Sequence, residues 1–334
     1  MFSSDELLES SERASTLVVV VRVATDCALG CQHCGFSREL SFARREINTS
    51  TLLKLGASLQ SIQERSNRRV LVSWLGGEPF QWSAWRNMSS QFKNDFGLAL
   101  SVTTNGLSLA SESVRSFALS NFNEITFSID GLESHHDMMR GSPGMFQRLQ
   151  SILEKIQKER VPGQTRLRVN TVLTEFNVSS FTEFCRQMAV WGFDELTFNP
   201  LGGNDRPAFF ANHRLTLSQV EKLLTELDRT RAECRDMGLV IRGGLGYLRR
   251  LIATARGERI AIDDCKPGKN FLFVDERGLV SPCSFTCGTL GIPVDQWIAD
   301  GASKSVQDFL GRKRFVRPTA CEDCLATNVF DKFT

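Results

Sequence analysis

The chain has 334 residues, of which 41% are hydrophobic and 9% aromatic, and its formal net charge is +2. This composition supplies a core for one large α/β domain and a small second one, and it excludes an intrinsically disordered chain. The balance of 40 basic and 38 acidic side chains gives no argument for nucleic acid, and we expect none as a partner.

Residues 1–15 form a polar, acidic segment that does not resemble a secretory signal. No apolar stretch reaches the ~18–20 residues that span a bilayer, so we expect no membrane. In a reducing compartment, the ten cysteines are more often metal ligands or catalytic groups than disulfides. The sequence therefore predicts a cytoplasmic metalloprotein.

Short apolar runs alternate with amphipathic stretches from residue 16 to about residue 240. The runs predict strands at 17–24, 69–75, 98–103, 124–129, 167–173 and 194–199, and the stretches predict helices near 48–66, 82–95, 109–120, 145–160, 178–191 and 216–237. This alternation indicates βαβ units and a parallel α/β sheet. Six such units match a partial (β/α)6 TIM-like barrel, although a doubly wound open sheet fits nearly as well.

The pattern changes after residue 246. A short helix is expected at 247–256, and the runs 271–275 and 279–281, separated by Glu-Arg-Gly, predict a β-hairpin. We expect residues 16–245 to form the barrel domain. Residues 246–334 would form a linker helix and a small cysteine-rich domain.

Three cysteines follow the first predicted strand directly. Cys27, Cys31 and Cys34 have the order Cys-x3-Cys-x2-Cys, and the next cysteine is Cys185. Iron–sulfur clusters are normally held by four thiolates, so three would leave one iron of a four-iron cluster open. Metal sites that do chemistry keep such an open position. Zinc is the alternative, although it usually takes two separated Cys-x2-Cys pairs.

The other predicted strands also end in residues that suit a ligand site. In chain order these are Gly76, Gly77 and Glu78; Thr104 and Asn105; Ser128 and Asp130; Asn170; and Asn199. In a parallel barrel, the carboxyl ends of the strands build the active site. Asn-Gly and Asp-Gly are ordinary turn dipeptides, but these five endings and the cysteine triplet, six in order, are hard to assign to turns alone.

Together these motifs resemble those of radical S-adenosylmethionine (SAM) enzymes that carry a C-terminal SPASM or twitch extension. The matching pieces are the cysteine triplet, Gly76-Gly-Glu-Pro79, Thr103-Thr-Asn-Gly106, Ser128-Ile-Asp-Gly131 and Arg140. The resemblance implies a [4Fe-4S] cluster whose open iron is chelated by the amino and carboxylate groups of SAM. It also implies reductive cleavage of SAM to a 5′-deoxyadenosyl radical, with electrons from a flavodoxin- or ferredoxin-type protein.

The resemblance also implies which residues contact SAM. Gly76 and Gly77 would let the backbone approach it closely, and Glu78 would accept a hydrogen bond from its ammonium group. The alternative for Glu78 is an exposed loop carboxylate. His33 stands where the family often has an aromatic residue near the adenine.

Further residues would bind the ribose and the carboxylate of SAM. Ser128 and Asp130 would bind the ribose hydroxyls, and Arg140 would hold the carboxylate bidentately. Thr104, Asn105 and Asn170 complete the expected SAM contacts. The alternatives are a turn aspartate for Asp130 and a surface salt bridge for Arg140. The neighbouring His135 and His136 are expected in a loop.

The late cysteines resemble a twitch domain. Cys265, Cys283, Cys321 and Cys324 would hold one auxiliary [4Fe-4S] cluster, although zinc also suits paired thiolates. Cys287 has no assigned role and is either a replacement ligand or a free thiol.

Two substrate classes stay open. The segment 265–283 resembles the peptide-maturing branch, so a ribosomally synthesised peptide is ranked first, with a cross-link, thioether or epimerised residue as the product of natural product biosynthesis. The second is a small molecule such as an aminosugar alcohol, oxidised by a dehydrogenase. A non-catalytic zinc-binding scaffold is the alternative of another kind. Specificity would lie in loops such as 201–210.

Overall fold

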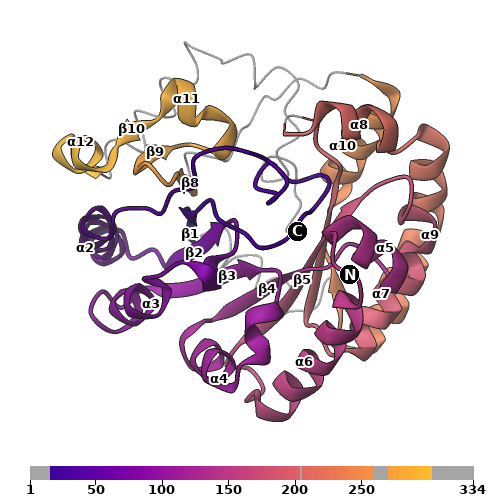
Figure 1. Cartoon of the computed structure of the whole chain (residues 1–334), viewed down its shortest axis with the longest axis horizontal. Helices are drawn as coiled ribbons and strands as arrows, with labels where there is room; N and C mark the ends of the chain where they lie inside the picture. Colours follow the sequence, from indigo (N-terminus) through magenta and orange to yellow (C-terminus); the bar gives the residue numbers. More distant parts are fainter. Residues whose placement is uncertain (1–15, 204, 259–269, 303–334) are drawn as a thin grey trace. The chain divides into compact units, whose positions relative to one another are not determined.

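The computed structural model in Figure 1 describes residues 16–203, 205–258 and 270–302. Contacts among these residues define two compact units. The first comprises residues 16–26, 44–102 and 270–302, and the second comprises residues 27–43, 103–203 and 205–258. The division into a domain at 16–245 and another at 246–334 stays a prediction.

The strands of the first unit lie in the order β10-β9-β8-β1-β2-β3. Their bounds are β1 (Leu17–Ala24), β2 (Val70–Gly76), β3 (Ala99–Thr104), β8 (Phe271–Val274), β9 (Leu279–Ser281) and β10 (Ile292–Pro293), with the end of β3 reaching into the second unit. β1 pairs in parallel with β2 and with β8, whereas β9 pairs antiparallel with β8 and β10. The expected hairpin therefore extends the sheet that contains β1.

The helices of this unit are α2 (Thr49–Ser66), η1 (Pro79–Gln81), α3 (Trp85–Asn94), η4 (Ser284–Thr286), α11 (Cys287–Leu290) and α12 (Val294–Ala299). α2 begins where the Asn48 side chain accepts hydrogen bonds from the amides of Ser50 and Thr51. Its residues Leu52 and Leu59 are fully buried, which places one apolar face of the helix in the core.

The strands of the second unit are all parallel and lie in the order β4-β5-β6-β7. They are β4 (Glu124–Ser128), β5 (Arg166–Leu173), β6 (Glu195–Pro200) and β7 (Val240–Ile241). The helices are η2 (Leu107–Ala110), α4 (Glu112–Asn121), α5 (Glu133–Arg140), α6 (Met145–Glu159), η3 (Val178–Ser180), α7 (Phe181–Val190), α8 (Pro207–His213), α9 (Leu217–Asp236) and α10 (Leu245–Arg256). A capping box of Thr216 and Gln219 starts α9.

Ion pairs join the amino-terminal ends of the strands in the second unit. Arg168 lies between Glu124, at 2.9 Å, and Glu195, at 2.7 Å, and Glu195 also pairs with Arg242 at 3.0 Å. A buried charge is tolerated when it is paired and hydrogen-bonded in this way. The network fixes the lateral order of β4, β5 and β6 at the edge opposite the candidate site.

The α/β class and the mostly parallel sheet are confirmed. The six predicted strands and the long predicted helices lie within a few residues of the observed elements. One expectation is wrong: His135 and His136 lie in α5 and not in a loop, and the His136 side chain is fully buried. Within the part of the chain that the structure describes, no helix has the length and apolar character needed to cross a bilayer.

Candidate functional site

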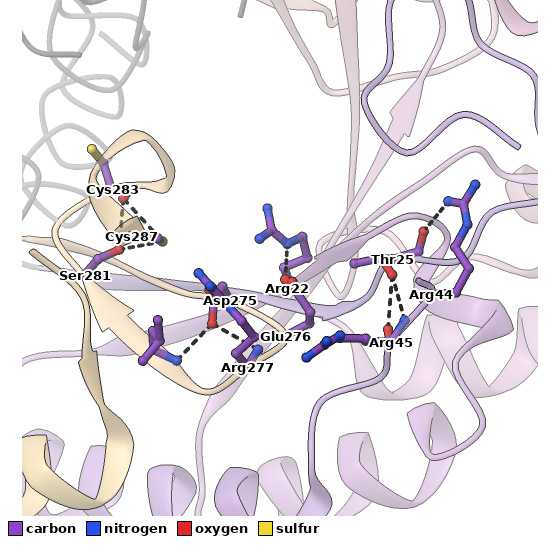
Figure 2. A network of polar contacts seen from close by, with 11 residues as sticks. Arg22, Thr25, Arg44, Arg45, Asp275, Glu276, Arg277, Ser281, Cys283 and Cys287 are labelled. Atoms are coloured by element: carbon purple, nitrogen blue, oxygen red, sulfur yellow. Dashed lines mark hydrogen bonds and ion pairs between the residues drawn. The ribbon is translucent and has the colours of Figure 1, made fainter. Parts of the chain in front are cut away.

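The three early cysteines lie on a loop, residues 27–43, that is closed at its base by backbone pairing. Thr25 donates from its amide to the Arg45 carbonyl at 2.9 Å, and the Arg45 amide donates to the Thr25 hydroxyl at 2.8 Å. Arg44 donates to the Thr25 carbonyl at 2.8 Å, and Figure 2 shows this closure. The sequence gives no signal for this closure, because none of these three residues belongs to the cysteine motif.

We call residues 27–43 the cysteine loop. Hydrogen bonds within this loop shape the turn that carries the cysteines. The Cys34 amide donates to the Cys31 carbonyl at 3.3 Å, and the Phe36 amide donates to the Cys34 sulfur at 3.3 Å. Cys31 is buried, while Cys27 and Cys34 are partly exposed. Amide donors at cysteine sulfurs are among the contacts that tune iron–sulfur clusters.

Arg140 and Asp130 form a buried ion pair beside this loop. Arg140 Nη2 lies 2.8 Å from Asp130 Oδ2, and Arg140 Nη1 lies 3.9 Å from the Cys31 sulfur. Arg140 is 8% exposed and Asp130 is 0% exposed, so the alternative of a surface salt bridge for Arg140 is wrong. The pair brings together two residues that the sequence indicates separately.

Burial and neighbouring charges together set the pKa values of Asp130, Arg140 and Cys31. Burial works to raise the pKa of the Asp130 carboxyl, but Arg140, together with the two neighbouring histidines and the Val172 amide, outweighs it and holds that pKa below its ordinary value. Burial works to lower the pKa of Arg140, but Asp130, together with Cys31 and Cys34, keeps it above its ordinary value. Burial raises the pKa of the Cys31 thiol, while Arg140 acts in the opposite direction. Both members of the ion pair are therefore charged at neutral pH.

Two histidines surround the ion pair. The Asp130 amide donates to His136 Nδ1 at 3.2 Å. Burial, and then Arg140, lowers the pKa of His136 to about 4, so this imidazole is neutral at physiological pH. Burial also lowers the pKa of His33. His33 Nδ1 is buried and has no hydrogen-bond partner among the described residues, which leaves its expected adenine contact a prediction.

Polar side chains form a row across β4, β5 and β6, level with the carboxyl end of β4. Ser128 is aligned with Asn170, and Asn170 is aligned with Thr197. Asn170 Oδ1 accepts hydrogen bonds from the Thr197 hydroxyl at 3.0 Å and from Asn199 Nδ2 at 2.8 Å. Thr197 was not indicated by the sequence, since threonine is an ordinary strand residue.

Thr104 and Asn105 shape the turn after β3. The Thr104 hydroxyl accepts from the Gly106 amide at 3.0 Å, and Asn105 Oδ1 accepts from the Leu107 amide at 3.0 Å. Both side chains are buried. These bonds account for the turn, and the SAM contacts expected for both residues stay predictions.

In the first unit, Gly76 and Gly77 lie against the end of β1. The Gly77 amide donates to the Ala24 carbonyl at 2.8 Å, and the Glu78 amide donates to the Asp26 carbonyl at 2.8 Å. Glu78 is 1% exposed, so the alternative of an exposed loop carboxylate is wrong. Glu78 Oε1 accepts from the Phe80 amide at 3.2 Å, which caps η1.

Cys283 and Cys287 follow the hairpin of the first unit (Figure 2): Cys283 comes directly before η4, and Cys287 is the first residue of α11. Both are buried. The Cys287 sulfur lies 3.0 Å from the Ser281 hydroxyl, and the Cys283 sulfur lies 3.4 Å from the Thr286 hydroxyl. Burial raises the pKa of the Cys287 thiol to about 11. The other expected auxiliary ligands, Cys265, Cys321 and Cys324, lie outside the described residues.

The cysteine loop fits a four-iron cluster. In the described ranges, no three His, Cys, Asp or Glu side chains converge as the ligands of one metal ion do. A cluster does not need that convergence, because each cysteine binds a different iron. An amide at one sulfur and a guanidinium near another suit thiolates that carry the negative charge of a cluster.

The model of the radical SAM superfamily matches residues 21–188 of the 334, a stretch that contains the cysteine loop and the Asp130–Arg140 pair. The chain belongs to the radical SAM superfamily, whose members hold a [4Fe-4S] cluster and use SAM. It is therefore a radical SAM enzyme.

One sequence relative and several solved structures are similar to this chain. The AdoMet-dependent heme synthase of Methanosarcina barkeri (strain Fusaro / DSM 804) is 24% identical over 283 residues, covering 80% of the chain and 76% of the synthase. SuiB of Streptococcus suis bound to S-adenosylmethionine has a TM-score of 0.65 at 16% identity, over 99% of this chain and 79% of SuiB. SuiB has also been solved with the precursor peptide SuiA.

A second solved structure, anSMEcpe with bound AdoMet and the Cp18Cys peptide, has a TM-score of 0.67 at 17% identity, over 93% of this chain and 88% of that protein. At such identities the two structures show a shared fold and nothing about the substrate of this chain.

Proposed function

We propose that this radical SAM enzyme holds its cluster on Cys27, Cys31 and Cys34 and modifies a ribosomally synthesised peptide. The observation that carries the cluster assignment is the cysteine loop, with a backbone donor at the Cys34 sulfur and the Arg140 guanidinium 3.9 Å from the Cys31 sulfur. When bound, the cluster supplies the electron that cleaves SAM to a 5′-deoxyadenosyl radical. The residues of the chain bind and orient the reactants and exclude water.

The roles of these residues follow from their burial and charge. Glu78 is a buried carboxylate, and a carboxylate oxygen can accept a charge-assisted hydrogen bond from the ammonium group of SAM. Arg140 Nε is buried and has no hydrogen-bond partner among the described residues, so it offers a donor to the SAM carboxylate. The glycines at 76 and 77, together with His33, Thr104, Asn105, Ser128 and Asn170, complete the proposed SAM site.

The strand and helix order supports a partial (β/α)6 barrel for residues 16–245 and a twitch-like domain for residues 246–334. In that domain, Cys283 would join Cys265, Cys321 and Cys324 in holding one auxiliary [4Fe-4S] cluster. The hairpin of β8 and β9, which is followed by the buried Cys283, supports this assignment. A cluster with four protein thiolates cannot bind SAM, so its role would be to accept the electron left on a substrate radical.

A peptide substrate is favoured by the fold that the chain shares with SuiB, which is solved with a precursor peptide, and with anSMEcpe, which is solved with the Cp18Cys peptide. The sequence relative named as a heme synthase favours a second candidate, oxidation of a small molecule. That class includes tetrapyrroles as well as aminosugar alcohols.

The test is anaerobic incubation of the reconstituted protein with SAM, dithionite and either peptides encoded beside the gene or small-molecule candidates. Mass spectrometry is then used to detect 5′-deoxyadenosine and the modified substrate. We expect 5′-deoxyadenosine together with a peptide that has lost two mass units or has isomerised. Turnover of a tetrapyrrole or an aminosugar alcohol but no peptide would replace the peptide proposal with the second candidate. Stoichiometric zinc in a colourless protein would overturn both.

A further inference from the structure

Asp130 has a place in the structure that SAM binding does not explain. We propose that the Asp130–Arg140 ion pair sets the reduction potential of the cluster on the cysteine loop, with Asp130 as a positioning residue that holds Arg140 against Cys31. This inference rests on the proposed cluster ligation by Cys27, Cys31 and Cys34.

Asp130 is held by three neighbouring segments. Its Oδ1 accepts from the Val172 amide at 3.0 Å, its amide donates to His136 Nδ1 at 3.2 Å, and its carbonyl accepts from Asn177 Nδ2. Its other carboxylate oxygen pairs with Arg140. A fully buried carboxylate with these partners has little freedom to rotate toward a ribose, but it is well placed to fix a neighbouring cation.

Arg140 is held at the cysteine loop from the other side. It is the last residue of α5, and the next residue, Gly141, has a φ of 58°, which is easily reached only by glycine. A Cβ atom at Gly141 would lie 2.9 Å from the Gly30 carbonyl oxygen. The Gln32 amide donates to the Met139 carbonyl at 3.2 Å. The end of α5 is therefore in direct contact with the residues that flank Cys31.

The two charges have opposite effects on a cluster. Adding an electron makes the cluster more negative, so a cation near Cys31 stabilises the reduced form and an anion destabilises it. In a buried setting of low dielectric these effects are larger than in water. Arg140 therefore raises the reduction potential, and Asp130 offsets part of that rise.

The shifts of the reduction potential expected in two variants have opposite signs, which distinguishes this role from a purely structural one. Asp130→Asn keeps a side-chain oxygen that can accept a hydrogen bond from Arg140, so the guanidinium stays beside Cys31 while its charge is no longer compensated, and the potential should rise. Arg140→Gln removes the cation and should lower it, while Arg140→Lys keeps the charge and should restore a value near that of the wild type. A role in folding alone would reduce cluster content in all variants without moving the potential in opposite directions.

The experiment is a redox titration of the full-length reconstituted protein without SAM, followed by electron paramagnetic resonance (EPR). The relevant signal is the one that SAM perturbs in the wild type, which separates it from any auxiliary cluster. At a fixed applied potential we expect the ratio of reduced to oxidised cluster to rise at least tenfold in Asp130→Asn, a shift of about 59 mV for a one-electron couple. Asp194→Asn is the matched control, because it breaks an ion pair with Arg160 (2.6 Å) before β6 and should leave the ratio unchanged.

Two results would overturn the inference. One is an Asp130→Asn potential equal to or below that of the wild type; the other is the same potential in Arg140→Gln and in the wild type. Should Arg140→Gln lose its iron, the Asp130→Asn and Arg140→Lys values decide the question. A wild-type protein without iron and sulfide would instead overturn the proposed function itself, which keeps the two failures distinct.

Discussion

A Cβ atom on Gly77 would lie 1.9 Å from the carbonyl oxygen of Asp26, the residue that precedes Cys27 in the chain. The contact is between backbone atoms, so no change of side-chain rotamer can relieve it. The sequence suggests that Gly76 and Gly77 make room for a ligand. The structure gives a second and more direct reason: the strand β2 can pair with the end of β1 only if these positions carry no side chain.

Gly77→Ala should therefore destabilise the protein by about 3 kcal/mol, because the backbone has to shift and break its hydrogen bonds to Ala24 and Asp26. The measurement is the thermal unfolding midpoint. Gly288→Ala is the matched control, since a Cβ atom there would meet nothing within 4 Å, and its midpoint should stay the same or rise slightly. Equal midpoints for the two variants would contradict the close backbone approach.

Replacing Cys27, Cys31 and Cys34 by alanine should remove on the order of four iron atoms per chain, with the matching sulfide, and abolish 5′-deoxyadenosine formation. Cys234→Ala serves as the control, because Cys234 is a buried thiol of α9 and is expected to be structural. Its iron content and SAM cleavage should equal those of the wild type. Full iron content in the triple variant would show that the cluster is held elsewhere.

The neutral His136 predicts a specific acid sensitivity. Its pKa in the folded protein is lowered to about 4 from 6.5, so between these values the unfolded chain binds a proton that the folded protein does not. Stability is therefore full above pH 6.5 and is lost as the pH falls toward 4. Between pH 7 and pH 5 the wild type should lose about 2 kcal/mol more than His136→Gln, as measured by urea unfolding at both pH values. The same loss in both proteins would show that His136 titrates normally when folded.

The hairpin that precedes Cys283 should depend on one ion pair to β1. Arg22 Nε lies 2.6 Å from Glu276 Oε2, and both side chains are mostly buried (Figure 2). Glu276→Gln should weaken the hairpin by about 1.5 kcal/mol, as expected for a charged hydrogen bond away from water, and should speed hydrogen exchange in β8 and β9. The control is Asp295→Asn, whose exposed pair with Lys54 at 2.8 Å should contribute less than about 1 kcal/mol. Unchanged exchange in Glu276→Gln would mean that strand pairing alone holds the hairpin.

Most of the fold could be predicted because the strands are short apolar runs with clear ends. The run 17–24 coincides with β1, and the amphipathic stretch 216–237 contains α9. α5 could not be predicted in the same way, because Glu-Ser-His-His-Asp has no apolar period. Its helix is stabilised by burial of His136 and Met139, which depends on tertiary contacts.

The candidate site could be predicted residue by residue but not as an arrangement. Spacing identifies the cysteine triplet, because ligands on one loop must be close in the chain. The linear order does not show that Asp130 pairs with Arg140, since one follows a strand and the other ends a helix. The same holds for the closure of the cysteine loop by Thr25 and Arg45, where the contacts are largely through the backbone.

The most direct test of the account is an EPR titration of the reduced, reconstituted protein with SAM, because it reports on the iron that the chain leaves open. If the chain leaves one iron open to SAM, added SAM should change the spectrum, and the change should saturate at about one SAM per chain. In Cys31→Ala this SAM-dependent change should be absent. A spectrum that stays the same at saturating SAM, in protein whose iron and sulfide content establishes the cluster, would show that SAM does not bind to an open iron of this cluster.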